Sequence, residues 1–129
     1  KRLIDIGANL LDEMFKGNYN GSNKHPPDLE SVLQRAWNIG VTQIVITAGN
    51  LRESRAALQL AKTDPRLFCT VGVHPTRCHE FDDEKNSNYM QELISVAKEG
   101  VQCGKCVCIG ECGLDYDRTQ FTDADTQRK

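Results

Sequence analysis

The sequence of 129 residues contains no apolar stretch long enough to span a bilayer, and no charged segment followed by an apolar run that would direct secretion. A formal net charge of −2 excludes a strongly basic phosphate-binding module. Aromatic residues make up only 6% of the chain, and they do not interleave with basic residues as in a groove for single-stranded nucleic acid. We therefore expect an intracellular protein, cytoplasmic or nuclear, whose contact with any nucleic acid is confined to a small site.

Cysteine, by contrast, is abundant, with six residues in this short chain. Cys103, Cys106, Cys108 and Cys112 are dense enough to suggest zinc or an iron–sulfur cluster. A structural zinc site needs two ligand pairs on turns, whereas Cys106 and Cys108 alternate with apolar residues as in a strand. Cysteine is often buried as a small apolar side chain, and a reducing compartment disfavours disulfides. We predict that these four thiols do not converge on a metal.

Short apolar runs alternate with amphipathic segments along the chain. The runs are typical of buried strands, which we expect over residues 3–8, 42–48, 67–73 and 105–110. The spacing of apolar residues predicts helices over residues 28–40, 50–64 and 88–100. A strand–helix alternation of this kind indicates parallel strands joined by right-handed crossovers. We expect one domain, residues 1–129, without an internal linker.

Several polar residues mark the ends of the expected helices. Asp28 and Asn88 stand where N-caps belong, and Asn50 with Glu53 three residues later forms a capping-box pattern. Gly100 is expected to end the third helix, and Asp123 or Asp125 to begin a fourth. The acidic residues between the third strand and the third helix, Glu80, Asp82, Asp83 and Glu84, are interpreted as a solvated loop.

Two parallel architectures fit this order of elements. A doubly wound sheet that binds nucleotides would carry a G-x-G-x-x-G loop after the first strand, and this chain has a single glycine there, Gly7. A (β/α)8 barrel places its chemistry at the carboxyl ends of its strands, and polar residues follow all four apolar runs: Asn9, Asn50, His74 and Glu111. A complete barrel needs about 250 residues. The sequence therefore predicts an α/β fold corresponding to about four β/α units, the first half of a TIM barrel.

Glu111 is the strongest candidate for a functional residue. It follows the fourth apolar run and is bracketed by Gly110 and Gly113, which permit sharp turns and close approach of a ligand. We expect a near-buried carboxylate, which requires a cation or hydrogen-bond donors. His74 ends the third run before Pro75, so both side chains should face the same mouth. Carboxylate and imidazole together are typical ligands of zinc, manganese or magnesium–manganese pairs.

Three ordered motifs carry a family resemblance: residues 5–10 (Asp-Ile-Gly-Ala-Asn-Leu), residues 72–75 (Gly-Val-His-Pro) and residues 109–116 (Ile-Gly-Glu-Cys-Gly-Leu-Asp-Tyr). The chain resembles the TatD-related metal-dependent deoxyribonucleases, and Thr76-Arg77-Cys78 is most similar to their eukaryotic branch. The resemblance covers nearly the whole chain but only the first half of the family's length.

The resemblance implies a barrel of the metal-dependent hydrolase type and divalent-metal hydrolysis of phosphodiester bonds, with DNA as substrate and exonuclease behaviour. It implies that Glu111 is a metal ligand, to magnesium, manganese or zinc, while two histidines and an aspartate on later strands complete the site. His74 is the second catalytic candidate, and Asn9 and His74 are lesser candidates for the metal. Many members begin with Asp-x-His-x-His, whereas Gly7 and Asn9 stand at the matching positions here.

Further roles and readings stay open. Asp115 is either a second contact near the metal or a turn residue, and Arg77 either meets a phosphate or is solvated. A related hydrolase acting on a small phosphoester or amide fits the same fold. So does a non-catalytic half-barrel that associates with a partner, or with itself, through open sheet edges.

Overall fold

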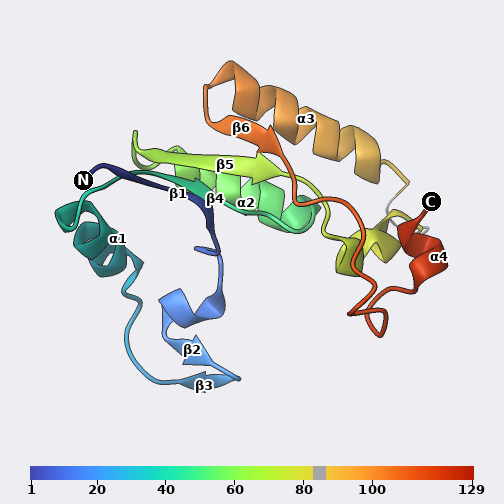
Figure 1. The fold of residues 1–129 in the computed structure, drawn as a ribbon, viewed down its shortest axis with the longest axis horizontal. Helices are drawn as coiled ribbons and strands as arrows, with labels where there is room; N and C mark the ends of the chain where they lie inside the picture. Colours follow the sequence, from blue (N-terminus) through green and yellow to red (C-terminus); the bar gives the residue numbers. More distant parts are fainter. Residues whose placement is uncertain (83–86) are drawn as a thin grey trace.

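The computed structural model describes residues 1–82 and 87–129 (Figure 1). Its centre is a parallel sheet of four strands: β1 (Leu3–Ala8), β4 (Val41–Ile46), β5 (Leu67–Val71) and β6 (Cys106–Ile109). The strands lie side by side in the order in which they occur in the chain. Because every right-handed crossover then lies on the same side, the helices cover one face, as in a barrel and unlike a doubly wound sheet.

Three longer helices join the strands: α1 (Leu29–Asn38), α2 (Leu51–Ala61) and α3 (Tyr89–Gln102). Figure 1 shows α2 lying across β4 and β5, and α3 beside β6. The core forms where α2 meets the central strands, and Ile46, Leu58 and Leu67 are at most 1% exposed there. None of the helices in the described ranges is long and apolar enough to cross a membrane.

Shorter elements fill the connections. A small hairpin of β2 (Asn18–Tyr19) and β3 (Ser22–Asn23) follows the 3₁₀ helix η1 (Glu13–Lys16). A second 3₁₀ helix, η2 (Pro75–Phe81), follows β5, and α4 (Ala124–Gln127) lies near the C-terminus. Asp83 and Glu84 of the expected acidic loop lie outside the described residues.

The prediction that all four strands are buried is wrong for the two outer ones. Ile4 and Ile6 of β1 are 56% and 78% exposed, and Val107 and Ile109 of β6 are 53% and 65% exposed. Side chains project from the two faces of a sheet, so apolar character buries them only where another layer covers that face. Within residues 1–82 and 87–129, only β4 and β5 have a strand on each side.

Helix ends were predicted with mixed success. The Asn50 side chain accepts a hydrogen bond from the Glu53 backbone N–H (2.8 Å), and the Asp123 side chain accepts one from the Thr126 N–H (2.9 Å), as expected. Asp28 and Asn88 occupy N-cap positions without a side-chain cap bond.

Gly100 does not end α3, because the helix continues to Gln102 and turns at Gly104 (φ +70°). A Cβ on Gly100 would lie 2.5 Å from the Cys106 Cβ, so the glycine permits close packing of α3 on β6.

Candidate functional site

Backbone hydrogen bonds tie together the carboxyl ends of the four strands. The Thr47 N–H donates to the Ala8 carbonyl (3.1 Å), the His74 N–H to the Gly49 carbonyl (2.9 Å) and the Glu111 N–H to the Ala48 carbonyl (3.1 Å). The segment after each strand is thereby held against its neighbour. This edge of the sheet is fixed by backbone geometry as well as by side chains.

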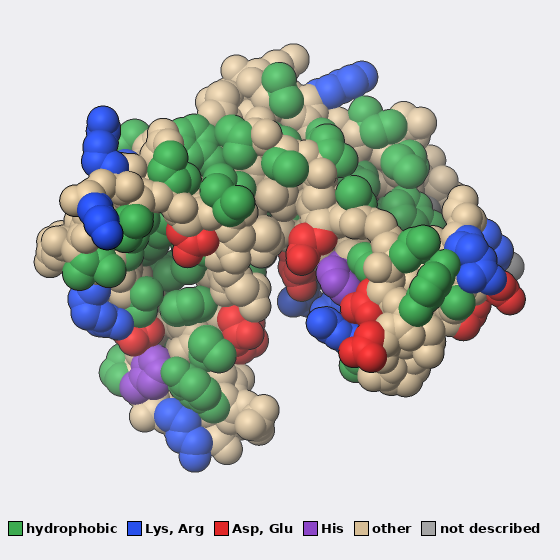
Figure 2. Space-filling view, in the orientation of Figure 1, with side chains coloured by type: hydrophobic (Ala, Val, Ile, Leu, Met, Phe, Trp, Pro, Cys, Tyr) green, Lys and Arg blue, Asp and Glu red, His purple; other side chains and the backbone are tan. Residues whose placement is uncertain are grey.

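A hollow of about 540 Å³ lies at this edge, and we call it the strand-end hollow. Asn9, His74 and Glu111, three of the four residues expected to follow the strands, all line it. Its other lining residues are Gly7, Thr47, Gly49, Glu53, Thr76, Arg77 and Arg118. In Figure 2 the molecule is hollowed between the lobe with β2 and β3 and the lobe with η2 and α4, and a histidine and charged side chains of both signs gather on the second wall.

Glu111 lies on the loop that follows β6, and its side chain faces solvent at the hollow. The expectation of a near-buried carboxylate is therefore wrong, because β6 is an outer strand of the sheet that the described residues form. A Cβ on Gly72 would lie 2.4 Å from the Gly110 carbonyl carbon, so Gly72 lets the Glu111 loop approach the end of β5. The peptide bond between Gly110 and Glu111 is cis.

His74 is the half-buried N-cap of η2. Its Nδ1 accepts a hydrogen bond from the Thr76 backbone N–H (3.1 Å) and lies 2.8 Å from the Thr76 hydroxyl. A backbone N–H can only donate, so Nδ1 is the acceptor and the ring proton resides on Nε2. A neutral imidazole binds a metal through its unprotonated nitrogen, which Thr76 occupies here. The geometry thus equips His74 to donate from Nε2–H to an anion in the hollow.

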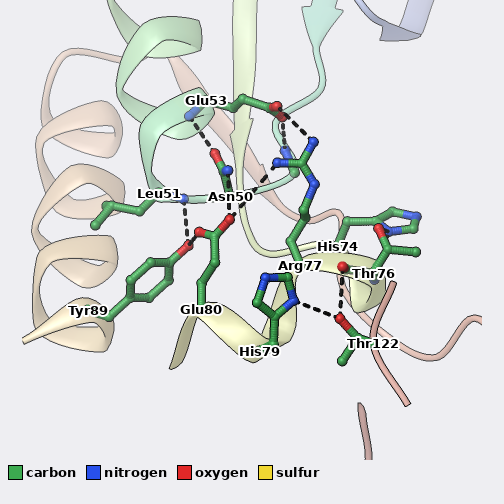
Figure 3. Close-up of polar contacts among 11 residues, drawn as sticks. Asn50, Leu51, Glu53, His74, Thr76, Arg77, His79, Glu80, Tyr89 and Thr122 are labelled. Atoms are coloured by element: carbon green, nitrogen blue, oxygen red, sulfur yellow. Dashed lines mark hydrogen bonds and ion pairs between the residues drawn. The ribbon is translucent and has the colours of Figure 1, made fainter. Parts of the chain in front are cut away.

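Arg77 projects from η2 between two carboxylates (Figure 3). Its guanidinium lies 3.9 Å from Glu53 Oε1 and 4.0 Å from Glu80 Oε1. Glu53 Oε2 also accepts a hydrogen bond from the Gly49 N–H (2.8 Å), so this carboxylate links the end of β4 to η2. Arg77 is half-exposed and lines the strand-end hollow. Its cationic group is therefore oriented by its neighbours yet accessible.

Glu80 is not the solvated loop residue that its acidic neighbours suggested. Its carboxylate accepts hydrogen bonds from the Asn50 amide (3.1 Å) and the Tyr89 hydroxyl (2.6 Å), and Tyr89 accepts one from the Leu51 N–H (3.0 Å) (Figure 3). Burial, followed by the hydrogen bond to Glu80, raises the pKa of Tyr89 to about 12. The network fastens η2 to the first turn of α2 and to the start of α3.

The segment after Glu111 is fastened to η2 in turn. The Thr122 hydroxyl donates to the Thr76 carbonyl (2.8 Å) and lies 2.8 Å from His79 Nδ1 (Figure 3). Asp115 accepts hydrogen bonds from the backbone N–H groups of Asp117 (3.1 Å) and Arg118 (3.2 Å) and pairs with the Arg118 guanidinium (3.4 Å). Asp115 is thus a turn residue that also orients Arg118 beside the hollow, one of the two roles left open.

The donor set fits a divalent metal ion only in part. Carboxylate and amide oxygens, as in Glu111 and Asn9, suit magnesium or manganese. A catalytic zinc centre uses about three protein ligands. Within residues 1–82 and 87–129, no three His, Cys, Asp or Glu side chains lie close enough to share an ion. Glu111 and Asn9 are therefore fewer than the protein ligands that a complete catalytic metal centre needs.

The six cysteines differ in their exposure. Cys69 and Cys106 are buried, Cys78 is half-buried, and Cys103, Cys108 and Cys112 are exposed. Burial raises the pKa of the Cys69 thiol to about 12, so the thiolate form that binds metals is disfavoured there. All six are free thiols.

Sequence reasoning missed two residues of this site. Glu53 was interpreted only as a capping residue, and Arg118 was not considered. Asp115 followed by Arg118 is a local i, i+3 pair that could have drawn notice to Arg118. The roles of Glu53 and Glu80 depend on partners from distant segments, for which the sequence carries no local signal.

The chain forms a partial (β/α) barrel with polar residues at its strand ends, and comparison with known proteins identifies the family. The model of the TatD-related DNase family matches residues 4–129, and the chain belongs to this family. It is 40% identical to Deoxyribonuclease Tat-D of Schizosaccharomyces pombe, over 98% of this chain and 41% of that protein. It is 32% identical to the 3'-5' ssDNA/RNA exonuclease TatD of Escherichia fergusonii, over 98% and 42%.

Solved structures agree on the fold. A hydrolase TatD family protein from Entamoeba histolytica superposes with a TM-score of 0.88 at 41% identity, over 99% of this chain and 42% of that one. An uncharacterized amidohydrolase from Saccharomyces cerevisiae superposes with a TM-score of 0.80 at 32% identity, over 98% and 41%. The predictions of family and fold class are confirmed, and the chain spans about two fifths of the length of its relatives.

Proposed function

We propose that this chain carries part of the active site of a divalent-metal-dependent deoxyribonuclease, an exonuclease that functions in DNA breakdown. The observation that supports the proposal is the strand-end hollow, where Glu111 and His74 meet Arg77 and Arg118 in a member of the TatD-related family. Anionic and cationic groups together suit a reaction that needs both a metal ion and a phosphate. The names of the relatives indicate single-stranded DNA as the first substrate to test.

Each residue has a separate task in this proposal. Glu111 holds the metal ion, which is magnesium, manganese or zinc, and Asn9 adds an amide oxygen. When bound, the metal lowers the pKa of a water molecule and offsets charge on the phosphate. His74 donates from Nε2–H to a phosphate oxygen, because its Nδ1 is occupied by Thr76. Arg77 supplies a positive charge that two carboxylates keep in place.

Residues 1–129 alone should hydrolyse DNA very weakly, because they offer fewer than the roughly three protein ligands of a catalytic metal centre. The test is a fusion of residues 1–129 to the C-terminal part of the Schizosaccharomyces pombe relative. We expect manganese-dependent release of nucleotides from single-stranded DNA by the fusion. A chromogenic phosphodiester assayed in parallel separates a DNase from a hydrolase of small substrates.

Glu111→Gln in the fusion should abolish the activity, since an amide lacks the negative charge that holds the ion. His74→Ala should reduce activity less, because His74 contacts the phosphate and not the metal. Glu30→Gln is the matched control on the exposed side of α1 and should change nothing. Equal rates for the fusion and its Glu111→Gln variant would show that Glu111 does not hold the metal.

We further propose that the outer strands mediate association, either with a partner or with a second copy of the chain. The exposed apolar side chains of β1 and β6, Ile4, Ile6, Val107 and Ile109, support this proposal, since an unpaired strand edge is a template for pairing. Light scattering after size exclusion should give a mass above 14.4 kDa, and Ile6→Lys should return it to that of a monomer. A monomeric mass for the unmodified chain would contradict self-association.

We also propose a cytoplasmic or nuclear location, where free thiols such as these stay reduced.

A further inference from the structure

A second hollow adjoins the strand-end hollow and is larger. Its volume is about 720 Å³, within the range of roughly 300–1,000 Å³ that is usual for small-ligand sites. It lies between η1, the start of α1 and the outer side of α2. Asn9, Glu53 and Arg77 line both hollows, so these three residues form a wall that the two hollows share. A ligand bound at the strand ends therefore has an adjacent space to enter.

Half-buried apolar side chains line much of this second hollow, namely those of Leu11, Phe15, Leu29 and Leu60. Phe15 is its aromatic member, and its backbone is fixed: the Phe15 N–H donates to the Asp12 carbonyl (3.1 Å), and its carbonyl accepts from the Asp28 N–H (3.0 Å). An aromatic ring on a fixed turn provides a surface on which a nucleobase of any sequence can stack.

The charges of the second hollow are balanced. Its basic residues are Lys16, Arg52 and Arg77, and its acidic residues are Asp12, Glu13 and Glu53. Lys16 pairs with Glu13 (2.6 Å) and Arg77 with Glu53 (3.9 Å). Balanced charge with an apolar lining suits an uncharged nucleoside better than a second phosphate.

Arg52 differs from the other two basic residues. It is exposed on the first turn of α2, and no ion pair joins it to a carboxylate in the described part of the chain. Arg52 and Arg77 also line one depression together with Asn50, Glu53 and Glu80, and Arg77 lines both hollows. Guanidinium groups are strong donors to phosphate, so these two arginines are the candidates for contact with the phosphate that links one nucleoside to the next.

We propose that the second hollow is a subsite for the nucleoside next to the phosphodiester bond, with its base against Phe15 and its phosphate at Arg52 and Arg77. This inference rests on the proposed nuclease function, because a mononucleotide enzyme or an amidohydrolase would have no neighbouring nucleoside. The subsite should make a dinucleotide bind more tightly than a phosphate alone.

The test is a binding measurement that needs neither metal nor hydrolysis. The ¹⁵N-labelled chain is titrated with thymidylyl-thymidine, d(TpT), and separately with inorganic phosphate, while its amide resonances are followed. We expect d(TpT) to shift the amides of residues 11–16, and phosphate to shift mainly those near His74 and Arg77. Equal affinity for the two probes, or no d(TpT) shifts in residues 11–16, would overturn the subsite.

Two variants sharpen the test. Phe15→Leu retains an apolar side chain but removes stacking, and it should weaken d(TpT) binding about tenfold while leaving phosphate binding unchanged. Arg52→Gln lies on an exposed surface, so it should not affect folding, and it should weaken d(TpT) binding about threefold. Arg35→Gln, exposed on α1 and outside both hollows, is the control and should have no effect. Unchanged d(TpT) affinity in both Phe15→Leu and Arg52→Gln would refute the proposal.

The two proposals fail in distinguishable ways. If the fusion does not hydrolyse DNA but d(TpT) still shifts residues 11–16, the nuclease assignment falls, while the second hollow still binds a dinucleotide. If the fusion hydrolyses DNA while Phe15→Leu binds d(TpT) normally, the nuclease assignment stands and the subsite falls.

Discussion

The central and outer parts of the sheet differ sharply, although their sequences look alike. Helix α2 packs on β5 and α3 and buries Leu51, Ser54, Ala57, Leu58 and Ala61, whereas α1, which is also amphipathic, has no fully buried residue. The outer strands β1 and β6 expose most of their apolar side chains. Burial therefore follows the number of neighbours that an element has, and not its own hydrophobic pattern.

The candidate site contains residues from both the central and the outer parts of the sheet. His74 and Arg77 follow the central strand β5, while Asn9 and Glu111 follow the outer strands β1 and β6. Backbone hydrogen bonds connect the two groups at the strand ends. In the proposed function, the metal position would thus depend on the less buried part of the molecule, and the phosphate contacts on the more buried part.

Matched leucine truncations in α2 and α1 provide the strongest test of this comparison. Leu58→Ala should lower the free energy of unfolding by roughly 2–5 kcal/mol, because the side chain is 1% exposed in the core. Leu33→Ala should cost about 1 kcal/mol, because the side chain is only half-buried against the same core. Urea denaturation followed by circular dichroism measures both.

The control is Ile39→Ala, since Ile39 is 74% exposed just beyond α1 and should lose almost nothing. Similar losses for Leu33→Ala and Leu58→Ala would show that the outer unit is packed as fully as the central one. The central and outer parts of the sheet would then not differ in how well they are packed.

The fold was predictable because its signals are local or topological. The capping pair Asn50 and Glu53 was readable from a spacing of three residues, and Asp123 was one of the two candidates for the last cap. Apolar runs that alternate with helical patterns fixed the parallel order of strands. Topology then brought Asn9, His74 and Glu111 to one hollow, because the carboxyl ends of parallel strands lie at one edge.

The predictions that were wrong concern residues whose roles depend on contacts between distant segments. Gly100 has the local appearance of a helix stop, but its role comes from Cys106 packed against it. Glu80 has acidic neighbours in sequence, but its partner Asn50 lies thirty residues away. Burial of β1 and β6 could not be predicted either, since it depends on which strands flank them. The metal and phosphate roles of Glu111 and His74 stay predictions.

A smaller effect tests how the outer helix α1 is joined to the centre. Arg66, just before β5, lies over the Trp37 ring of α1 (4.1 Å to the centroid) and is held by two side-chain hydrogen bonds to Asp64 (2.9 and 2.7 Å). These bonds lower the pKa of Asp64 from 3.8 to about 2. A carboxylate with a lowered pKa stabilises the folded state above the unfolded pKa, and this contribution is lost as pH falls from 3.8 through about 2.

Asp64→Asn should therefore lower the free energy of unfolding by roughly 1 kcal/mol at pH 7, as expected for a partly exposed bidentate pair. The difference from the unmodified chain should shrink toward zero near pH 2. Urea denaturation at pH 7, 4 and 2.5 measures the effect, and a difference that stays constant across these values would show that the charge of Asp64 does not stabilise the fold.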